Sequence, residues 1–289
     1  MVFPGPVKEI LNLFKLRIGV AIAFAAAAGV AVQQGPSPGG AAMAVLVLAV
    51  LVASAAAGAF NQYVERDLDR QMARTRARPF VTGALRHGPA WLWLIGAMTA
   101  GAVAATWLAT NFIAGVYVFL GAFTYGVVYT VWLKRRTWWN IVVGGLAGSF
   151  AVLAGAAAVA PAPGPAAAAL AVVLFLWTPP HFWSLAIACR EDYAAAGVPM
   201  LPVVVGDARA ARAIFASATL LVAASLVPFF FSLGIAYLAC AAFGGAFFLV
   251  RCRQLVRRPS RESARAAFFA SLVQLCAVLS GAMLDVALS

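Results

Sequence analysis

Residues 41–62 read AAMAVLVLAVLVASAAAGAFNQ, and residues 63–70 read YVERDLDR. The first stretch carries no charged side chain. As a helix it is long enough to cross the hydrocarbon core of a bilayer, which is about 30 Å thick. The second stretch places acidic and basic side chains directly at its end. Together they predict a transmembrane helix with a polar cluster at the membrane boundary.

The composition of the whole chain agrees with a membrane protein. Hydrophobic residues make up 64% of the 289 residues and charged residues 10%, whereas a soluble domain carries about 25% charged residues. We predict an all-α integral membrane protein that forms one domain, residues 1–289. Nine apolar stretches have the length of a span: 18–34, 41–62, 89–109, 112–132, 139–160, 166–188, 212–231, 233–250 and 266–286.

The placement of charge predicts the orientation of these spans. All 21 Lys and Arg residues lie in the amino-terminal segment or in the connections after spans two, four, six and eight. Because Lys and Arg are enriched in cytoplasmic loops, the N-terminus is expected inside and the C-terminus outside. Of the nine carboxylates only Asp285 falls outside. The net charge of +12 is therefore a topology signal, and nucleic acid is not an expected partner.

The acidic cluster after the second span is a candidate metal site. Asn61, Glu65 and Asp69 are spaced by four residues, so on a continuing helix they project from one face. Asp67 points nearly the opposite way. Carboxylate and amide oxygens are the ligands that magnesium prefers, and the ion commonly shares its shell with substrate phosphates. The alternative is a solvated helix end with salt bridges to the neighbouring arginines.

Basic residues follow the acidic cluster closely. Arg74, Arg76 and Arg78 could clamp the oxygens of a diphosphate, or they could anchor the helix end at lipid headgroups. A second basic group, residues 134–136, contains Lys134 and Arg135 and follows span four. Its alternative reading as an ordinary cytoplasmic charge cluster is stronger, because every inner loop needs such residues.

A further polar segment lies within the sixth span. Residues 177–183 read WTPPHFW and place His181 about 13 Å into the membrane. His181 could contact heme or another substrate, or it could bond the backbone carbonyls that the paired prolines free. At the end of this span, Glu191 and Asp192 offer a second carboxylate pair on the inner side. These features favour an anionic, metal-bridged ligand with an apolar tail at the inner leaflet.

At these residues the chain resembles the UbiA superfamily of intramembrane prenyltransferases. Within it, the chain is most similar to the branch that farnesylates protoheme IX to give heme O. The matching motifs are N-x-x-x-E-R-D-x-D-x-x-M-x-R-T-x-x-R-P, Y-T-x-x-L-K-R-R-T, W-T-P-P-H-F-W and E-D-Y-x-x-A-G-V-P-M-L-P, at residues 61–79, 129–137, 177–183 and 191–202. The resemblance covers nearly the whole chain and implies nine helices around a central cavity.

The resemblance also implies roles for these residues. Mg2+ bound by Asn61, Glu65 and Asp69 would hold the head of farnesyl diphosphate, with Asp192 as a ligand of a second ion. The departing diphosphate would be neutralised by Arg74, Arg78, Lys134 and Arg135. The expected substrate contacts are Tyr129, Trp177, His181, Glu191 and Asp192. The implied partners are farnesyl diphosphate, heme b and the lipid of the cytoplasmic membrane, with heme A synthase as a further candidate and the active site facing the cytoplasm.

The chain departs from the pattern of the superfamily at three places. Many members have an aspartate directly after the motif asparagine, where this chain has Gln62, as the heme branch does. The second acidic motif lacks the Asp-x-x-x-Asp spacing found elsewhere in the superfamily. The heme branch usually reads Thr-Pro-Gln-Asn after its basic group, where this chain has Trp138 and Trp139 between Thr137 and Asn140.

Other functions stay open at this point. The nearest alternative is prenylation of an aromatic quinone precursor, against which the W-T-P-P-H-F-W segment counts. A transporter would place its coupling residues near the bilayer midplane, where this chain is almost free of charge. A purely structural membrane subunit would have no need for the cluster of carboxylates and arginines.

Overall fold

The computed structural model describes residues 6–289, and within these residues it contains helices and no strand. Eight helices are long and apolar enough to cross a membrane. A shorter apolar helix, α2, lies at the first predicted span. The predicted all-α membrane fold is confirmed, and the count of nine crossings stays a prediction. The long elements are α2 (Leu16–Val32), α3 (Gly40–Val64), α6 (Ala90–Ala109), α7 (Phe112–Phe123), α9 (Leu146–Val159), α10 (Pro165–Ala188), α13 (Asp207–Leu226), α14 (Ile235–Arg257) and α15 (Arg261–Leu288).

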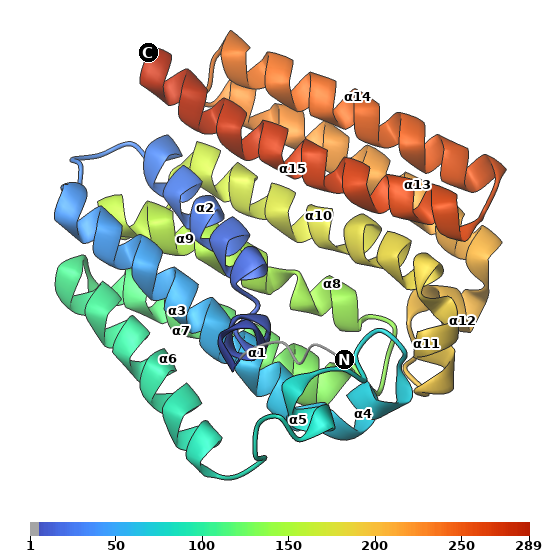
Figure 1. Ribbon diagram of the computed structural model, residues 1–289. Helices are drawn as coiled ribbons and strands as arrows, with labels where there is room; N and C mark the ends of the chain where they lie inside the picture. Colours follow the sequence, from blue (N-terminus) through green and yellow to red (C-terminus); the bar gives the residue numbers. More distant parts are fainter. Residues whose placement is uncertain (1–5) are drawn as a thin grey trace.

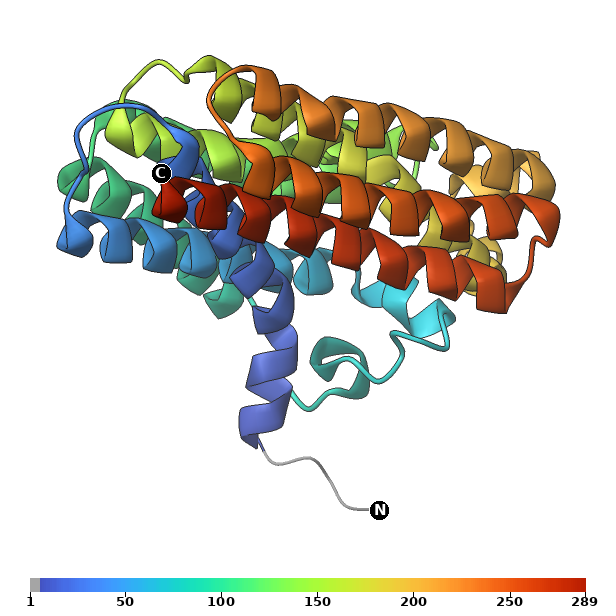
Figure 2. The same ribbon diagram turned by 90° about the horizontal axis from the view of Figure 1, so that it is seen from above.

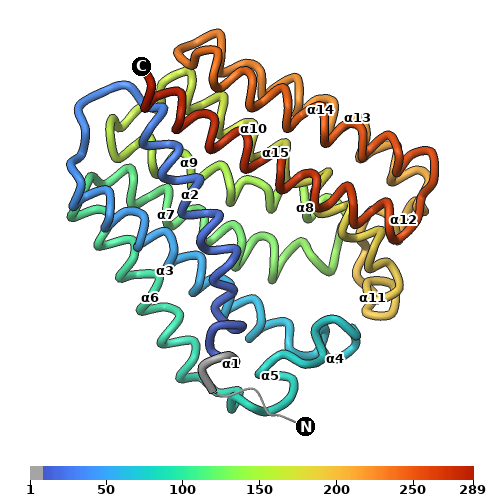
Figure 3. Tube along the Cα trace, turned by 45° about the horizontal axis from the view of Figure 1, so that its top comes forward, coloured from blue at the N-terminus to red at the C-terminus, as the bar shows by residue number. Residues whose placement is uncertain are grey.

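Short helices connect the long ones and gather at one end of the bundle, opposite the C-terminus (Figures 1 and 3). They are α1 (Pro6–Leu13), α4 (Arg66–Gln71), α5 (Pro79–Thr82), α11 (Arg190–Ala195) and α12 (Leu201–Val205). Helix α8 (Asn140–Gly144) is also short, but it forms one candidate span with α9, Asn140–Val159. Figure 2 shows α1 and α5 projecting on the same side of the body of long helices. This end carries the basic connections and is the one predicted to face the cytoplasm.

The middle of the bundle is formed by α2, α9 and α10, flanked by α3, α6 and α7 on one side and by α13, α14 and α15 on the other (Figure 1). Helices α2 and α9 cross very closely. A Cβ atom at Gly29 would clash with the backbone of Val152, and one at Gly155 would clash with the backbone of Ala26. Small residues at such crossings allow helices to pack tightly in a membrane.

Several predicted helix boundaries differ from those of the structure. The ninth span was expected from 266, but α15 begins at Arg261. The seventh and eighth spans were expected at 212–231 and 233–250, but α13 begins at Asp207 and α14 ends at Arg257. Both helices continue beyond their apolar parts because arginines can extend a helix into the aqueous boundary. The turn between them is a short 3-10 segment, Val227–Phe230, which contains Pro228.

The fourth span contains a feature that hydropathy does not reveal. Helix α7 continues without interruption into a π-helix, Thr124–Leu133. Single π turns are the usual form, and they are frequent at functional sites. The wider turn changes which side chains face inward over the last ten residues before Lys134.

Candidate active site

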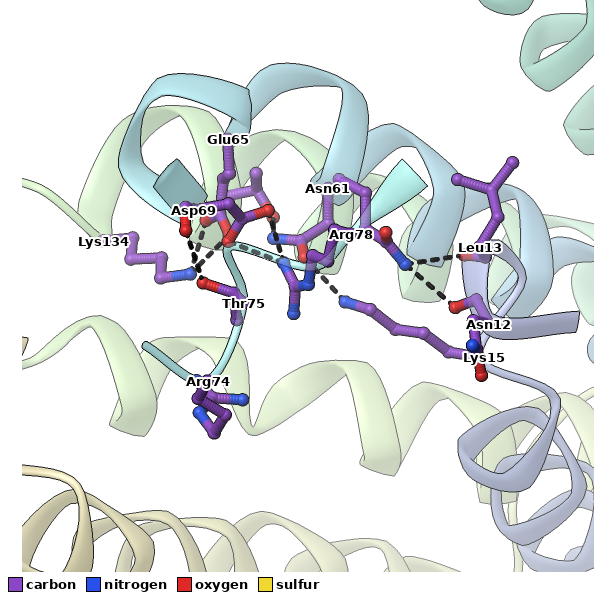
Figure 4. A network of polar contacts seen from close by, with 12 residues as sticks. Asn12, Leu13, Lys15, Asn61, Glu65, Asp69, Arg74, Thr75, Arg78 and Lys134 are labelled. Carbon is purple, nitrogen blue, oxygen red and sulfur yellow. Dashed lines mark hydrogen bonds and ion pairs between the residues drawn. The ribbon is translucent and has the colours of Figure 1, made fainter. Parts of the chain in front are cut away.

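The junction of α3 and α4 places three oxygen-bearing side chains on one face (Figure 4). Helix α3 ends at Val64 and α4 begins at Arg66. The backbone N–H of Glu65 donates to the carbonyl of Asn61 at 3.0 Å, and that of Asp69 donates to the carbonyl of Glu65 at 2.8 Å. This four-residue spacing keeps Asn61, Glu65 and Asp69 aligned across the junction. Their exposed fractions are only 2%, 1% and 0%.

Each of the three oxygen donors is paired with a cation. Lys134 Nζ lies 2.5 and 2.6 Å from the two carboxylate oxygens of Glu65. One guanidinium nitrogen of Arg78 lies 2.8 and 2.7 Å from the two oxygens of Asp69. Removing either cation would leave a buried carboxylate without compensation, which is strongly destabilising.

The third cation comes from a residue that the sequence analysis did not select. Lys15 lies between α1 and α2, and its Nζ donates to Asn61 Oδ1 at 2.6 Å and to the hydroxyl of Tyr125 at 3.1 Å. The Nδ2 of Asn61 donates to Thr130 Oγ1 at 3.1 Å. Both sides of the Asn61 amide are therefore bonded, and its oxygen faces a cation.

The π-helix and the loop after α4 bring the other cations inward. The backbone N–H of Lys134 donates to the carbonyl of Tyr129 at 2.9 Å, a five-residue step that turns Lys134 toward Glu65. Lys134 Nζ also lies 5.7 Å from the centre of the Tyr129 ring. In the loop, Thr75 Oγ1 donates to the backbone carbonyl of Asp69 at 3.0 Å, which folds the segment with Arg78 back over the acids.

Burial in this cluster shifts the pKa values of Lys15 and Asp69 toward their uncharged forms. Burial of its amine, together with the charge of Arg78, lowers the pKa of Lys15 to about 7. Burial raises the pKa of Asp69, although the charge and hydrogen bonds of Arg78 oppose the shift. The charged forms of these groups therefore depend on their partners within the site.

The second acidic segment contacts the loop that follows α4, through backbone N–H groups of that loop. Asp192, at the start of α11, accepts hydrogen bonds from the backbone N–H groups of Ala73 at 3.1 Å and Arg74 at 3.3 Å. The Arg74 guanidinium donates to the Tyr193 hydroxyl at 3.5 Å. Glu191 is exposed. Asp192 thus holds the arginine loop, and within residues 6–289 no group of three or more His, Cys, Asp and Glu side chains converges as a metal site.

Two side chains of the WTPPHFW segment, Trp177 and His181, contact α15. Trp177 Nε1 donates to the backbone carbonyl of Ser271 at 2.8 Å, and His181 Nδ1 lies 2.6 Å from Ser271 Oγ. The buried His181 ring stacks between Trp177, at 4.0 Å between centroids, and Phe268, at 4.4 Å. None of these contacts reaches Asn61, Glu65 or Asp69. The structure therefore separates this aromatic group from the acidic cluster.

An apolar cavity of about 100 Å³ begins beside the acidic cluster. Lys15 and Tyr125 line its polar end, and side chains of α2, α3, α7 and α9, many of them small, line the rest. Among them are Ala53, Ala57, Gly121 and Ala151. A chain with an anionic head and a narrow apolar tail fits this arrangement, with the head at the carboxylates and cations and the tail between the helices.

The model of the UbiA prenyltransferase family matches residues 21–273. The chain belongs to the UbiA prenyltransferase family. This confirms the resemblance drawn from the motifs, and with the apolar helices it identifies an integral, multi-pass membrane protein with the fold of a prenyltransferase.

Two relatives from Paramagnetospirillum magneticum illustrate the similarity within the UbiA family. Protoheme IX farnesyltransferase 2 is 54% identical over 279 residues, which cover 96% of this chain and 97% of the relative. Protoheme IX farnesyltransferase 1 is 48% identical over 76% of this chain and 78% of its own length.

Solved structures confirm the fold at low sequence identity. A UbiA homologue from Archaeoglobus fulgidus bound to DMAPP and Mg2+ is 18% identical with a TM-score of 0.74, covering 97% of this chain and 100% of its own. An apo UbiA homologue from Aeropyrum pernix K1 is 19% identical with a TM-score of 0.74, covering 93% of this chain and 98% of its own.

The predicted basic residues have different surroundings in this UbiA-family structure. Lys134 is buried and forms an ion pair with Glu65, whereas Arg135, the next residue, is exposed. Arg78 contacts Asp69, whereas the side chain of Arg74 turns to Tyr193. Of the four predicted basic residues, Lys134 and Arg78 thus contact the buried acids, whereas the side chains of Arg135 and Arg74 do not.

Proposed function

We propose that the protein transfers a farnesyl group from farnesyl diphosphate to a vinyl group of protoheme IX (heme b), giving heme O. Two relatives with this activity in their names match 96% and 76% of the chain, at 54% and 48% identity. The observation that carries the proposal is that Lys15, which contacts the buried cluster through Asn61, also lines an apolar cavity. That cluster contains three buried oxygen donors and their basic partners. A prenyl diphosphate has an anionic head that suits the cluster and an apolar tail that suits the cavity.

Magnesium fits the oxygen donors. Asn61, Glu65 and Asp69 offer hard oxygen ligands on one buried face, and Mg2+ is commonly held by carboxylates together with substrate phosphates. Asp192 is the proposed ligand of a second ion, reached from the other side of the arginine loop. When bound, the metal neutralises diphosphate oxygens as a Lewis acid. The Archaeoglobus fulgidus homologue was solved with Mg2+ and DMAPP, which supports this choice.

The basic residues of the chain assist departure of the diphosphate. Lys134 and Arg78, which contact Glu65 and Asp69, are placed to donate to diphosphate oxygens beside those acids. Arg74 and Arg135 add charge at the rim. The bond between the first farnesyl carbon and the diphosphate oxygen breaks, and the electron pair leaves with the diphosphate. Donors aimed at this developing charge lower the barrier.

The acceptor completes the reaction. The π electrons of the heme vinyl group form the new carbon–carbon bond with the allylic cation, and water then adds to the resulting cation and loses a proton. Tyr129 is proposed as a substrate contact, because it lies beneath Lys134. Trp177 and His181 are proposed to shape the heme side through Ser271. Glu191 and Asp192 complete the proposed substrate contacts at the rim. The apolar walls exclude water until the last step.

The location of the reaction follows from the charge pattern. We place the site on the cytoplasmic side of the cytoplasmic membrane, within one domain that spans residues 1–289, because the basic connections surround it. The lipid bilayer supplies the farnesyl diphosphate laterally. Contact with heme A synthase, which would consume the product, stays a prediction.

Incubation of membranes containing the protein with labelled farnesyl diphosphate and either heme b or 4-hydroxybenzoate tests the proposal. The expected product is labelled heme O, identified by its mass, with no labelled benzoate. Labelled benzoate alone would instead support the aromatic alternative. Mg2+ removal by a chelator should stop the reaction, and its return should restore it.

A further inference from the structure

Lys15 has an unusual backbone conformation. Its φ and ψ are 48° and 42°, in the left-handed region, and within residues 6–289 it is the sole non-glycine residue with a positive φ. This region is sterically unfavourable for a residue with a Cβ atom. Such strain persists where the surrounding structure enforces it, and it is concentrated at functional sites.

Gln62 fixes the chain directly before Lys15. Its side-chain Nε2 donates to the backbone carbonyls of Asn12 at 2.9 Å and Leu13 at 3.1 Å. Gln62 is 3% exposed, and the side chain of Leu13 is fully buried against Phe80 and its neighbours. A carboxylate at position 62 has no N–H to donate to either carbonyl. The glutamine therefore anchors the end of α1 in a way that a carboxylate could not.

The anchored turn directs Lys15 to the boundary between head and tail. Its Nζ contacts Asn61 Oδ1 at 2.6 Å and the Tyr125 hydroxyl at 3.1 Å. The other end of the Asn61 amide donates to Thr130. Lys15 also lines the apolar cavity, together with Tyr125 and Gly58. The same amine therefore orients the amide and closes the polar end of the cavity.

We propose that Lys15 is a positioning residue for prenyl-diphosphate binding, placed by Gln62 so that it orients the Asn61 amide and separates the diphosphate head from the prenyl tail. The inference rests on the proposed function. It adds the amino-terminal segment and Gln62 to the machinery and gives Gln62 a role in anchoring the chain. Loss of the ammonium group weakens binding of the diphosphate, because hydrogen bonds from charged donors are stronger than those between neutral groups.

Lys15→Met, which keeps an unbranched side chain one atom shorter and removes its charge, tests the proposal. Purified protein in detergent is titrated with farnesyl thiodiphosphate, an unreactive analogue, in Mg2+, and binding is read from the shift in thermal stability. We expect the affinity to fall by about tenfold or more and KM for farnesyl diphosphate to rise more than kcat falls. Lys15→Arg should recover part of the affinity. The matched control is Arg17→Met, since Arg17 is exposed two residues away, and it should bind as the wild type does.

Gln62→Glu tests the anchor, because it keeps the shape of the side chain and removes the N–H donors. It should weaken analogue binding in the same direction as Lys15→Met while the protein remains folded. A folded Lys15→Met protein that binds the analogue with wild-type affinity would overturn the inference. If the wild type itself neither binds the analogue nor makes heme O, the proposed function fails instead.

Discussion

The two ends of the bundle each bury carboxylates, but they satisfy them in different ways. At the α3–α4 end, Glu65 and Asp69 are paired with the side-chain cations Lys134 and Arg78. At the opposite end, Asp285 of α15 accepts hydrogen bonds from the backbone N–H groups of Gly234 at 2.5 Å and Tyr237 at 3.2 Å, at the start of α14. Backbone donors cannot leave their acceptor without unfolding a helix end, whereas side-chain cations can move to a new anion.

We propose that this difference separates a structural acid, Asp285, from the acids of the proposed metal site. A carboxylate at a helix N-terminus stabilises the helix through its first N–H groups, and Gly234 leaves room for it, because a Cβ there would lie 3.0 Å from Asp285 Oδ1. A carboxylate held by movable cations can instead exchange them for a metal ion, while the cations turn to the phosphate. The following substitutions test this contrast, from the largest expected effect to the smallest.

Asp69→Ala should reduce heme O formation to less than about 1% of wild type, because it removes a proposed metal ligand and loss of even a supporting residue costs 10–100-fold. Product is measured by mass spectrometry of heme extracted from membranes, normalised to the amount of inserted protein. Asp69→Asn, which keeps the shape, should be equally inactive. An active Asp69→Ala protein would remove Asp69 from the site.

Lys134→Met should lower the free energy of unfolding by about 3–5 kcal/mol, because it leaves Glu65 buried and unpaired. Thermal unfolding in detergent measures the loss. The double variant Glu65→Gln with Lys134→Met removes both charges and should recover most of the stability while staying inactive. Recovery of activity together with stability would show that the pair is structural, like Asp285.

Asp285→Ala should destabilise the protein by about 1–2 kcal/mol, the usual cost of losing a helix cap. The heme O formed per folded molecule should stay unchanged. The measurement compares the unfolding temperature with the specific activity of the same preparation. A loss of specific activity comparable to that of Asp69→Ala would contradict the division between the two ends.

Asp67→Ala should have the smallest effect. Asp67 lies two residues from Asp69 but is exposed on α4, and exposed substitutions usually change stability by less than about 0.5 kcal/mol. Activity should stay within about twofold of wild type. A severe loss in a folded protein would mean that the face of α4 toward solvent also binds substrate.

Hydropathy and charge placement were sufficient to predict the helical membrane fold, because both follow from local composition. The shared face of Asn61, Glu65 and Asp69 was also predictable, because four-residue spacing survives the break at Glu65. The contact between Lys15 and Asn61 was not, because it joins residues 46 positions apart through a turn that is unfavourable for lysine. The π-helix leaves no mark in hydropathy, so the inward turn of Lys134 and the outward position of Arg135 could not be separated.

The most direct measurement replaces Mg2+ with Mn2+ and follows metal binding by electron paramagnetic resonance in the presence of farnesyl thiodiphosphate. The account predicts analogue-dependent Mn2+ binding in the wild type and in Asp285→Asn, and none in Asp69→Asn. Equal Mn2+ binding by folded Asp69→Asn protein would contradict it, because the metal would then be held somewhere other than the face formed by Asn61, Glu65 and Asp69.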